Sequence, residues 1–197
     1  MTQRRKTGDD RRAEIRRVAL ELFTVRGYEA TSMREIAERL DITKAALYYH
    51  FDSKESIVRS LFEERLATLD ALIEWAEAQP PSADRTARIA AGWFSLVVEG
   101  GLGFARFALA NQAALRDLMP HKGGAGGLDR MQKVSALMAD PGTPPLELLK
   151  IRMALMSANL AVMGSHDLNL TDEEIIRAAA ETASLLAPGL ASAIMPG

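Results

Sequence analysis

Seven side chains that suit a DNA groove stand between positions 43 and 54 of the sequence. They are Thr43, Lys44, Ala45, Tyr48, Tyr49, His50 and Lys54. Hydroxyl groups and cations bind phosphate oxygens, and a lysine can donate to the O6 and N7 acceptors of guanine in the major groove. We therefore expect this segment to contact double-stranded DNA.

The chemistry of these side chains divides them into two groups. Those expected at base edges are Thr43, Lys44, Ala45 and Arg34, with Lys44 as the strongest candidate for a guanine contact. Those expected at phosphates are Tyr48, Tyr49, His50 and Lys54, together with Thr31 and Ser32 at the start of the preceding helix. Three have a structural alternative: Tyr48 as a core residue, Arg34 as a solvated helix residue and His50 as a cap.

Two short helices joined by a tight turn would position these groups. Ser32 and Glu35 form a capping-box pattern at the start of the first helix. Asp41 tolerates the left-handed backbone conformation that a sharp turn requires, and Thr43 is a good N-cap for a second helix over residues 44–51. The side chains expected to pack inward from this second helix are Leu47 and Phe51.

This arrangement is that of a helix-turn-helix unit. The second helix of such a unit enters the major groove with its N-terminal residues at base edges. The alternative is an ordinary helical hairpin in a helical core, because similar spacing arises by chance in all-helical proteins.

From Gly27 to Glu55 the residues resemble the TetR family of transcriptional regulators. The residues that match the family pattern are Thr43, Tyr48, His50, Phe51 and Lys54. Asp41 and Ala45 depart from it, because the family usually has glycine at both positions. Aspartate can supply the same backbone geometry in the turn. The methyl group of Ala45 either costs a DNA contact or touches a thymine methyl.

Composition excludes several classes of site. The chain has no cysteine, which rules out disulfides and thiolate metal sites. Its three histidines are scattered, and neither an HExxH nor a Gly-x-Ser-x-Gly pattern occurs, so we expect no enzyme, cofactor or metal. No apolar segment follows the basic N-terminus, so we expect no signal peptide, no membrane contact and a cytoplasmic location.

Positive charge is concentrated at the start of the chain, although the net charge is −2. Residues 1–17 have a balance of +4, residues 31–59 are neutral, and residues 66–197 have a balance of −4. We therefore expect the N-terminal arm and the first helix to supply the positive field for DNA.

Helical periodicity continues along the rest of the chain with no competing strand pattern. The expected helices cover residues 11–26, 53–78, 84–99, 103–118, 128–138, 145–164 and 171–187, in addition to the two described above. We expect an all-α fold in three parts. These are a basic flexible arm (1–9), a three-helix helix-turn-helix DNA-binding domain (10–54) and a larger helical domain for effector binding and dimerisation (55–197). The glycine-rich segment 121–127 lacks the Lys-Ser/Thr ending of a phosphate loop and is expected to be a flexible connector.

The last two predicted helices indicate a homodimer. Residues 145–164 are apolar nearly all round, so one core face does not account for them. Residues 171–187 carry several alanines, which permit close helix approach. A four-helix bundle made by two copies is the simplest solution, and it is also what the TetR resemblance implies. The alternative is one large monomeric core.

Aromatic and methionine side chains suggest a ligand cavity in the C-terminal part. The predicted ligand-binding residues are Trp93, Phe94, Phe104, Phe107, Asn111, Met156, Asn159 and Met163. Few charges occur on these helices, which favours a small, largely apolar effector. The resemblance implies a repressor that such an effector releases from a palindromic operator. A ligand-independent or architectural DNA-binding protein, or an activator, remains the alternative.

Overall fold

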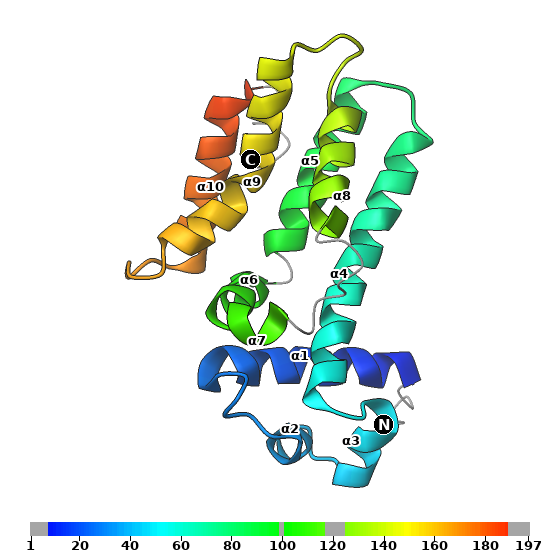
Figure 1. Ribbon diagram of the computed structural model, residues 1–197, viewed down its shortest axis with the longest axis vertical. Coiled ribbons are helices and arrows are strands. Elements are labelled where there is room, and N and C mark those ends of the chain that lie inside the picture. The colour runs from blue at the N-terminus through cyan, green and yellow to red at the C-terminus, as the bar shows by residue number, and fades with distance from the viewer. Residues whose placement is uncertain (1–7, 99–100, 117–124, 189–197) are drawn as a thin grey trace, which may run out of the picture. The chain divides into compact units, whose positions relative to one another are not determined.

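The computed structural model describes residues 8–98, 101–116 and 125–188 (Figure 1). Within these ranges the chain is helical and contains no strand, which confirms the all-α prediction. The helices are α1 (Gly8–Arg26), α2 (Met33–Arg39), α3 (Lys44–His50), α4 (Lys54–Glu77), α5 (Ala83–Val98), α6 (Gly101–Ala110), α7 (Gln112–Arg116), α8 (Ala125–Met138), α9 (Pro145–Gly164) and α10 (Asp172–Leu186). Most of the glycine-rich segment 121–127 lies outside the described residues.

Side-chain caps fix the starts of three helices where the sequence predicts them. The Ser32 hydroxyl accepts from the Glu35 N–H at 3.2 Å, and the Ser32 N–H donates to the Glu35 carboxylate at 2.7 Å. Thr43 accepts from the Ala46 N–H at 3.1 Å, and Thr171 forms a second capping box, with Glu174, before α10. These caps satisfy amide donors that would otherwise lack partners.

The single helix predicted over residues 103–118 is wrong, because the structure divides this segment into α6 and α7. The break falls at Asn111, whose side-chain Nδ2 donates to the Phe107 carbonyl at 2.9 Å. Asparagine side chains compete with the backbone for hydrogen bonds and so favour helix ends over helix interiors.

The chain forms two compact units. The N-terminal unit contains the described residues up to 64 and also residues 106–116, and the C-terminal unit contains the remainder. Two helices, α4 and α6, therefore contribute to both units. This division differs from the expected boundary at residue 54, since half of α6 and all of α7 belong with the N-terminal unit.

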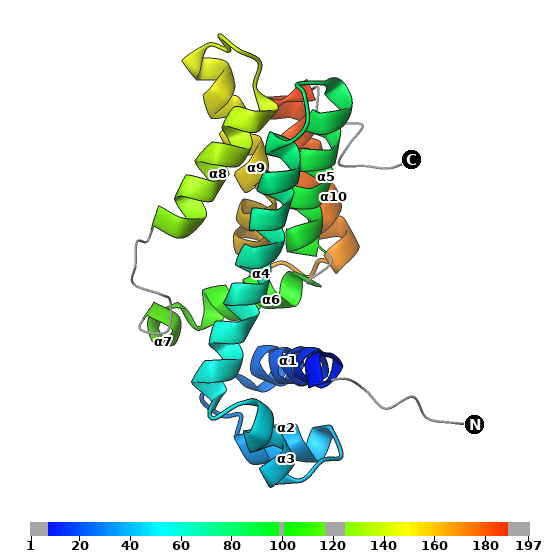
Figure 2. The ribbon, with the colours of Figure 1, turned by 90° about the vertical axis from the view of Figure 1, so that its right-hand side faces the viewer.

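The N-terminal unit has a core in which residues distant in sequence meet. Phe23 of α1 stacks on Phe107 of α6 with ring centroids 5.5 Å apart, and Tyr28 meets both rings at an angle. Ile36 of α2 and Leu47 of α3 are also fully buried. Two helices of this unit, α2 and α3, lie side by side (Figures 1 and 2).

The four arginines in the first half of α1 all have partners. Arg11 and Arg17 pair with Glu14 and Glu21 on the same helix, each at 2.8 Å. Arg16 reaches α4, where it contacts Ser60 at 3.2 Å and Glu64 at 2.8 Å. Arg12 donates to the carbonyl of His50 at 2.7 Å, and its guanidinium lies 4.3 Å from the centre of the Phe51 ring. Arginines 12 and 16 thereby fasten α1 to the end of α3 and to α4.

The C-terminal unit has one apolar core to which α4, α5, α8, α9 and α10 contribute. Helices α9 and α10 lie side by side, and the buried Ser157 hydroxyl of α9 donates to the Ala179 carbonyl of α10 at 3.0 Å (Figure 1). The buried Arg85 of α5 donates to the carbonyls of Gln79 and Leu137, at 3.1 and 2.6 Å. The Leu137 carbonyl lies in the last turn of α8, where a cation is electrostatically favourable, and Gln79 lies two residues beyond the end of α4.

Across the described ranges, every helix is too short or too polar to span a bilayer.

Candidate DNA-binding site

The turn between α2 and α3 has the geometry that the sequence predicts. Asp41 has a φ of 52°, in the left-handed region. The Ile42 N–H donates to the Ala37 carbonyl at 3.0 Å, which returns the chain toward α2. Leu47 and Phe51 are buried as expected, so α3 is fixed against the unit by one face. The opposite face of α3 is left to solvent.

The exposed face of α3 carries most of the predicted base-reading and phosphate-contacting groups. Its exposed residues are Lys44, Ala45, Ala46, Tyr48 and Tyr49, preceded by the exposed cap Thr43. Tyr48 is 41% exposed and Tyr49 is 86% exposed, so neither is a core residue. The Lys44 ammonium lies 5.6 Å from the centre of the Tyr48 ring, one helical turn away.

His50 and Arg34 lie at the margins of this face. The half-buried His50 ring meets Tyr49 edge-on, with centroids 5.1 Å apart. Arg34 is exposed on α2 and donates to Glu38 at 2.7 Å, and this hydrogen bond raises the pKa of the arginine. An exposed ion pair of this kind is weak, so Arg34 can exchange Glu38 for another acceptor.

Thr31 is only 1% exposed, which contradicts the expectation of a phosphate contact. Its hydroxyl donates to the carbonyl of Gly27 at 2.8 Å and so closes the loop between α1 and α2. Ser32 is exposed, and its hydroxyl is engaged by Glu35. The hydrogen bonds from the Ser32 backbone and hydroxyl lower the pKa of Glu35.

Lys54 has structural partners that the sequence does not reveal. Its ammonium donates to the carbonyls of Tyr28 and Glu29, at 2.8 and 3.3 Å, and lies 4.6 Å from the centre of the Tyr28 ring. The neighbouring Glu55 accepts from the Tyr28 hydroxyl at 2.9 Å. Burial, followed by this hydrogen bond, raises the pKa of Tyr28, so the phenol stays protonated. Tyr28 therefore fixes the start of α4, through Lys54 and Glu55.

We expect Lys54→Met to lower the free energy of unfolding by about 1.5–3 kcal/mol, the usual cost of losing hydrogen bonds from a charged group. Urea denaturation followed by circular dichroism measures this change. Lys44→Met is the matched control, because Lys44 is exposed and surface substitutions usually alter stability by no more than about 0.5 kcal/mol. Equal stability of the two variants would show that Lys54 has no structural role.

The predicted ligand-binding residues are divided between the two units. Phe107 and Asn111 belong to the N-terminal unit, where Phe107 is 1% exposed in the aromatic core. A ligand contact by these two residues stays a prediction. The sequence alone could not separate core from pocket for aromatic residues at helical spacing.

The other predicted ligand-binding residues lie in two settings within the C-terminal unit. Met156, Asn159 and Met163 are exposed on α9. Phe94 is buried in the apolar core, and the indole N–H of Trp93 donates to the Leu155 carbonyl at 2.8 Å. The Arg65 guanidinium lies over the Phe104 ring, and its Cζ atom is 4.1 Å from the centre of that ring.

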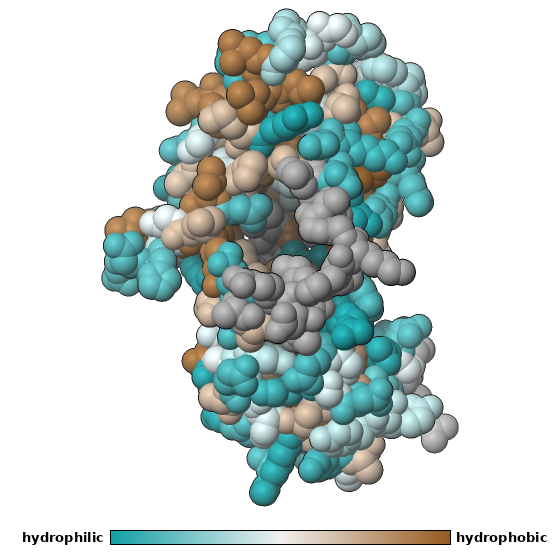
Figure 3. All heavy atoms as spheres, viewed as in Figure 1, coloured by the Kyte–Doolittle hydropathy of each residue, from teal (hydrophilic) through white to brown (hydrophobic). Residues whose placement is uncertain are grey.

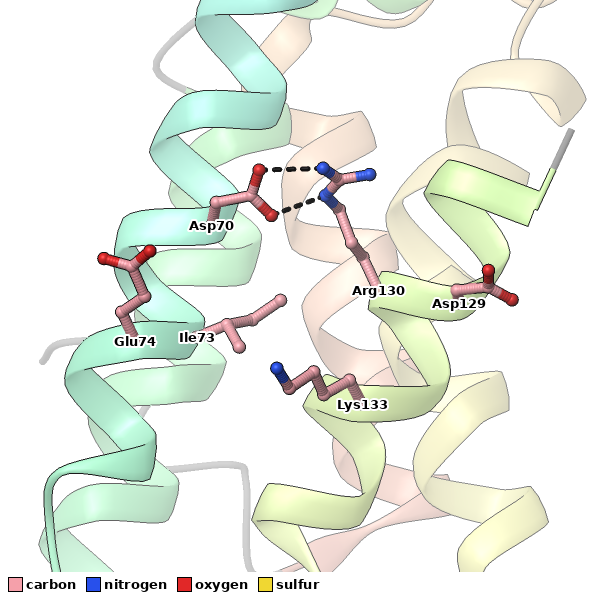
Figure 4. A pocket seen from close by; sticks show the side chains of 6 residues that line it. All are labelled: Asp70, Ile73, Glu74, Asp129, Arg130 and Lys133. Atoms are coloured by element: carbon pink, nitrogen blue, oxygen red, sulfur yellow. Dashed lines mark hydrogen bonds and ion pairs between the residues drawn. The ribbon is translucent and has the colours of Figure 1, made fainter. Parts of the chain in front are cut away.

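A pocket of about 370 Å³ lies between α4 and α8 of the C-terminal unit (Figure 4). Its lining residues are Asp70, Ile73, Glu74, Asp129, Arg130 and Lys133. Arg130 donates to both carboxylate oxygens of Asp70, at 2.6 and 2.7 Å, which lowers the pKa of that aspartate. The sequence does not reveal this pocket, because its charged residues have the pattern of ordinary solvated helix positions.

Sequence similarity to known proteins lies in the segment that contains the exposed face of α3. Residues 15–61 match the family model described as bacterial regulatory proteins, tetR family. The chain is 54% identical over 39 residues to the biofilm operon icaADBC HTH-type negative transcriptional regulator IcaR of Staphylococcus aureus (strain Newman). That match covers 20% of this chain and 21% of the relative, so the chain spans about a fifth of the length of the curated protein.

Solved structures extend the similarity to the whole fold. The TetR family transcriptional regulator PfmR of Thermus thermophilus has a TM-score of 0.63 and 25% identity, covering 89% of this chain and 98% of PfmR. AibR, in complex with isovaleryl coenzyme A and operator DNA, has a TM-score of 0.57 and 22% identity, covering 90% and 98%. With the cap, turn and exposed face of α3 in place, residues 15–61 form a domain of the tetR family of bacterial regulatory proteins.

Proposed function

We propose that the protein is a sequence-specific DNA-binding transcriptional regulator, and that it acts as a homodimeric repressor. The observation that carries this proposal is the exposed face of α3, which presents Lys44, two alanines and two tyrosines while Leu47 and Phe51 hold the helix from behind. A helix held in this way, with polar and small groups outward, fits the major groove. Negative regulation is what the name of the S. aureus relative states for that protein.

The surface of α9 supports the dimer. Six large apolar side chains of this helix are between 41% and 63% exposed: Leu146, Leu149, Met153, Met156, Leu160 and Met163. Their positions alternate three and four residues apart, which is the spacing of a coiled-coil seam. We call these six residues the α9 seam. Figure 3 shows hydrophobic side chains gathered over the region of α9 and α10.

Helix α10 also exposes a row of side chains to solvent. Ala178, Thr182 and Leu185 are exposed at the same three-to-four spacing, and Leu185 is 84% exposed. Exposed apolar surface of this extent marks an interaction site. A second copy can cover it, because a two-fold axis brings the same seam from each chain together. We call α2, the turn and α3 (residues 33–50) the reading head. Two reading heads about 34–36 Å apart would then bind a palindromic operator.

A small effector is the proposed signal for release from DNA. For the effector to act, it must bind the DNA-incompetent state more tightly than the DNA-bound state. The expectation of a largely apolar molecule rests on the low charge of the C-terminal helices. The pocket between α4 and α8 has five ionisable side chains and one isoleucine in its lining, so any part of the effector that lies there is polar.

Selection of bound DNA from a random library tests the proposal. The full chain should enrich one site with two-fold symmetry, and added metabolites or lipophilic compounds should release it at fixed salt concentration. An asymmetric consensus would contradict the proposed homodimer, and the absence of a consensus would contradict sequence-specific binding. Binding that no compound alters would favour a ligand-independent DNA-binding protein.

Within the reading head, we expect Lys44→Ala to relax sequence preference at one position of each half-site. Loss of the guanine contact should cost about 1–3 kcal/mol against the preferred site and much less against other sites. Repeating the library selection with the variant measures this change. A uniform loss of affinity for all sequences would assign Lys44 to a phosphate instead.

Deletion of residues 1–7 should weaken binding to all DNA sequences alike, because it removes Arg4, Arg5 and Lys6. The logarithm of the binding constant falls linearly with the logarithm of the salt concentration. Each phosphate contact that is lost makes this slope less steep by about 0.9. Fluorescence anisotropy over a range of salt concentrations measures the slope. An unchanged slope would exclude the arm as a source of affinity.

A further inference from the structure

The exposed face of α3 carries a small apolar patch. Ala45, Ala46 and Tyr49 are all exposed, and Tyr49 follows the two alanines by four and three residues. Residues at these spacings are neighbours on a helix surface. We call these three residues the alanine patch.

The polar groups of the same face have partners of their own. The Lys44 ammonium extends toward the Tyr48 ring, one turn along the helix. The Thr43 hydroxyl is held at the helix start by the Ala46 N–H. The alanine side chains themselves have no donor or acceptor, so they cannot recognise a base through hydrogen bonds. Whatever they recognise must be apolar and must approach closely.

The major-groove edges of the four base pairs present one apolar group, the C5-methyl of thymine. Apart from the C–H edges, such as C5–H of cytosine, the other groups are hydrogen-bond donors or acceptors, which a methyl group would desolvate without replacement. Side chains larger than alanine would hold the backbone of α3 away from the bases. Glycine would leave the thymine methyl in contact with water.

We propose that Ala45 and Ala46 read thymine through its C5-methyl group, beside the base that Lys44 contacts. This inference rests on the proposed DNA-binding function and adds a chemical class to it: a half-site that contains thymine at the positions facing the alanine patch. Tyr49 is a helix-surface neighbour of both alanines, so its ring would cover one side of the methyl contact.

Replacement of single thymines by deoxyuridine in the selected operator tests this inference, because it removes the methyl group and leaves every hydrogen-bonding group unchanged. We expect about a fourfold loss of affinity at each contacted thymine, the factor that burial of one methyl group contributes. Deoxyuridine at thymines outside the half-sites should leave affinity unchanged. Loss at no position, or equal loss at all positions, would overturn the inference.

Glycine variants show which alanine makes each contact. In Ala45→Gly or Ala46→Gly, the ratio of affinities for thymine and deoxyuridine at the matching position should fall from about four to about one. This ratio compares two DNA molecules bound to one protein, so a general loss of helix stability cancels. Ala67→Gly, on an exposed position of α4, is the matched control and should keep the ratio of the parent chain.

The experiment separates this inference from the proposed function. If a symmetric operator is selected and its affinity does not depend on thymine methyl groups, the inference about the alanine patch is overturned. The proposed function as a DNA-binding regulator is then unaffected. Failure to select any operator would overturn both.

Discussion

Replacement of Leu149 and Met156 by glutamate is expected to convert the protein to a monomer of 21.5 kDa and to lower its operator affinity by about 100-fold or more. Both side chains are exposed at the centre of the α9 seam. In the proposed dimer they would be buried, where two unpaired carboxylates per chain are strongly unfavourable. A monomer binds one half-site at a time and loses the advantage of two linked heads.

Light scattering at micromolar concentration measures the mass, and fluorescence anisotropy measures the affinity for a full site and for a half-site. Val25→Glu is the control, because Val25 is 83% exposed on α1, outside the seam, and should leave mass unchanged. A parent chain that is already monomeric, or a double variant that stays dimeric, would contradict the α9 seam as the interface.

Phe107→Ala is expected to destabilise the N-terminal unit by about 3–5 kcal/mol, the usual cost of truncating a buried phenylalanine. The ring is fully buried against Phe23 and Tyr28. Tyr28 in turn holds Lys54 and Glu55 at the start of α4. A cavity beside Tyr28 should therefore disturb α3 as well, and operator binding should fall together with stability.

Hydrogen exchange resolves the effect by region, because amides of α1 to α3 should lose protection while those of α9 and α10 keep it. Phe107→Leu is the matched variant and should recover most of the stability, since it fills most of the volume. Phe104→Ala, three residues earlier, truncates a ring of the C-terminal unit and should leave α1 to α3 protected. Equal loss of protection in both units would show that the aromatic cluster does not belong to the N-terminal unit alone.

The features that the sequence predicts well depend on short-range chemistry. Ser32 with Glu35, Thr43 and Asp41 each act on backbone groups within four residues, so their types and spacing contain the whole signal. The inward position of Leu47 and Phe51 follows from helical periodicity in the same way. The reading head was therefore predictable almost residue by residue.

The features that the sequence could not predict depend on partners far along the chain. Phe107 meets Phe23 across 84 positions, and Lys54 meets Tyr28 across 26. No local pattern distinguishes such a phenylalanine from a pocket residue, or such a lysine from a phosphate contact. The expected phosphate contact of Thr31 has the same difficulty, because the burial of this side chain depends on how α1 and α2 pack around it.

The partners of the α1 arginines change how the charge of the chain acts on DNA. Residues 1–17 have a balance of +4 in the sequence, yet Arg11, Arg16 and Arg17 each pair with a carboxylate, and Arg12 donates to a carbonyl. Cations neutralised within the protein displace few counterions from the phosphate backbone. The salt dependence of binding should therefore reflect the short basic arm and the few cations of the reading head, and affinity should respond to ionic strength less steeply than the sequence charge implies.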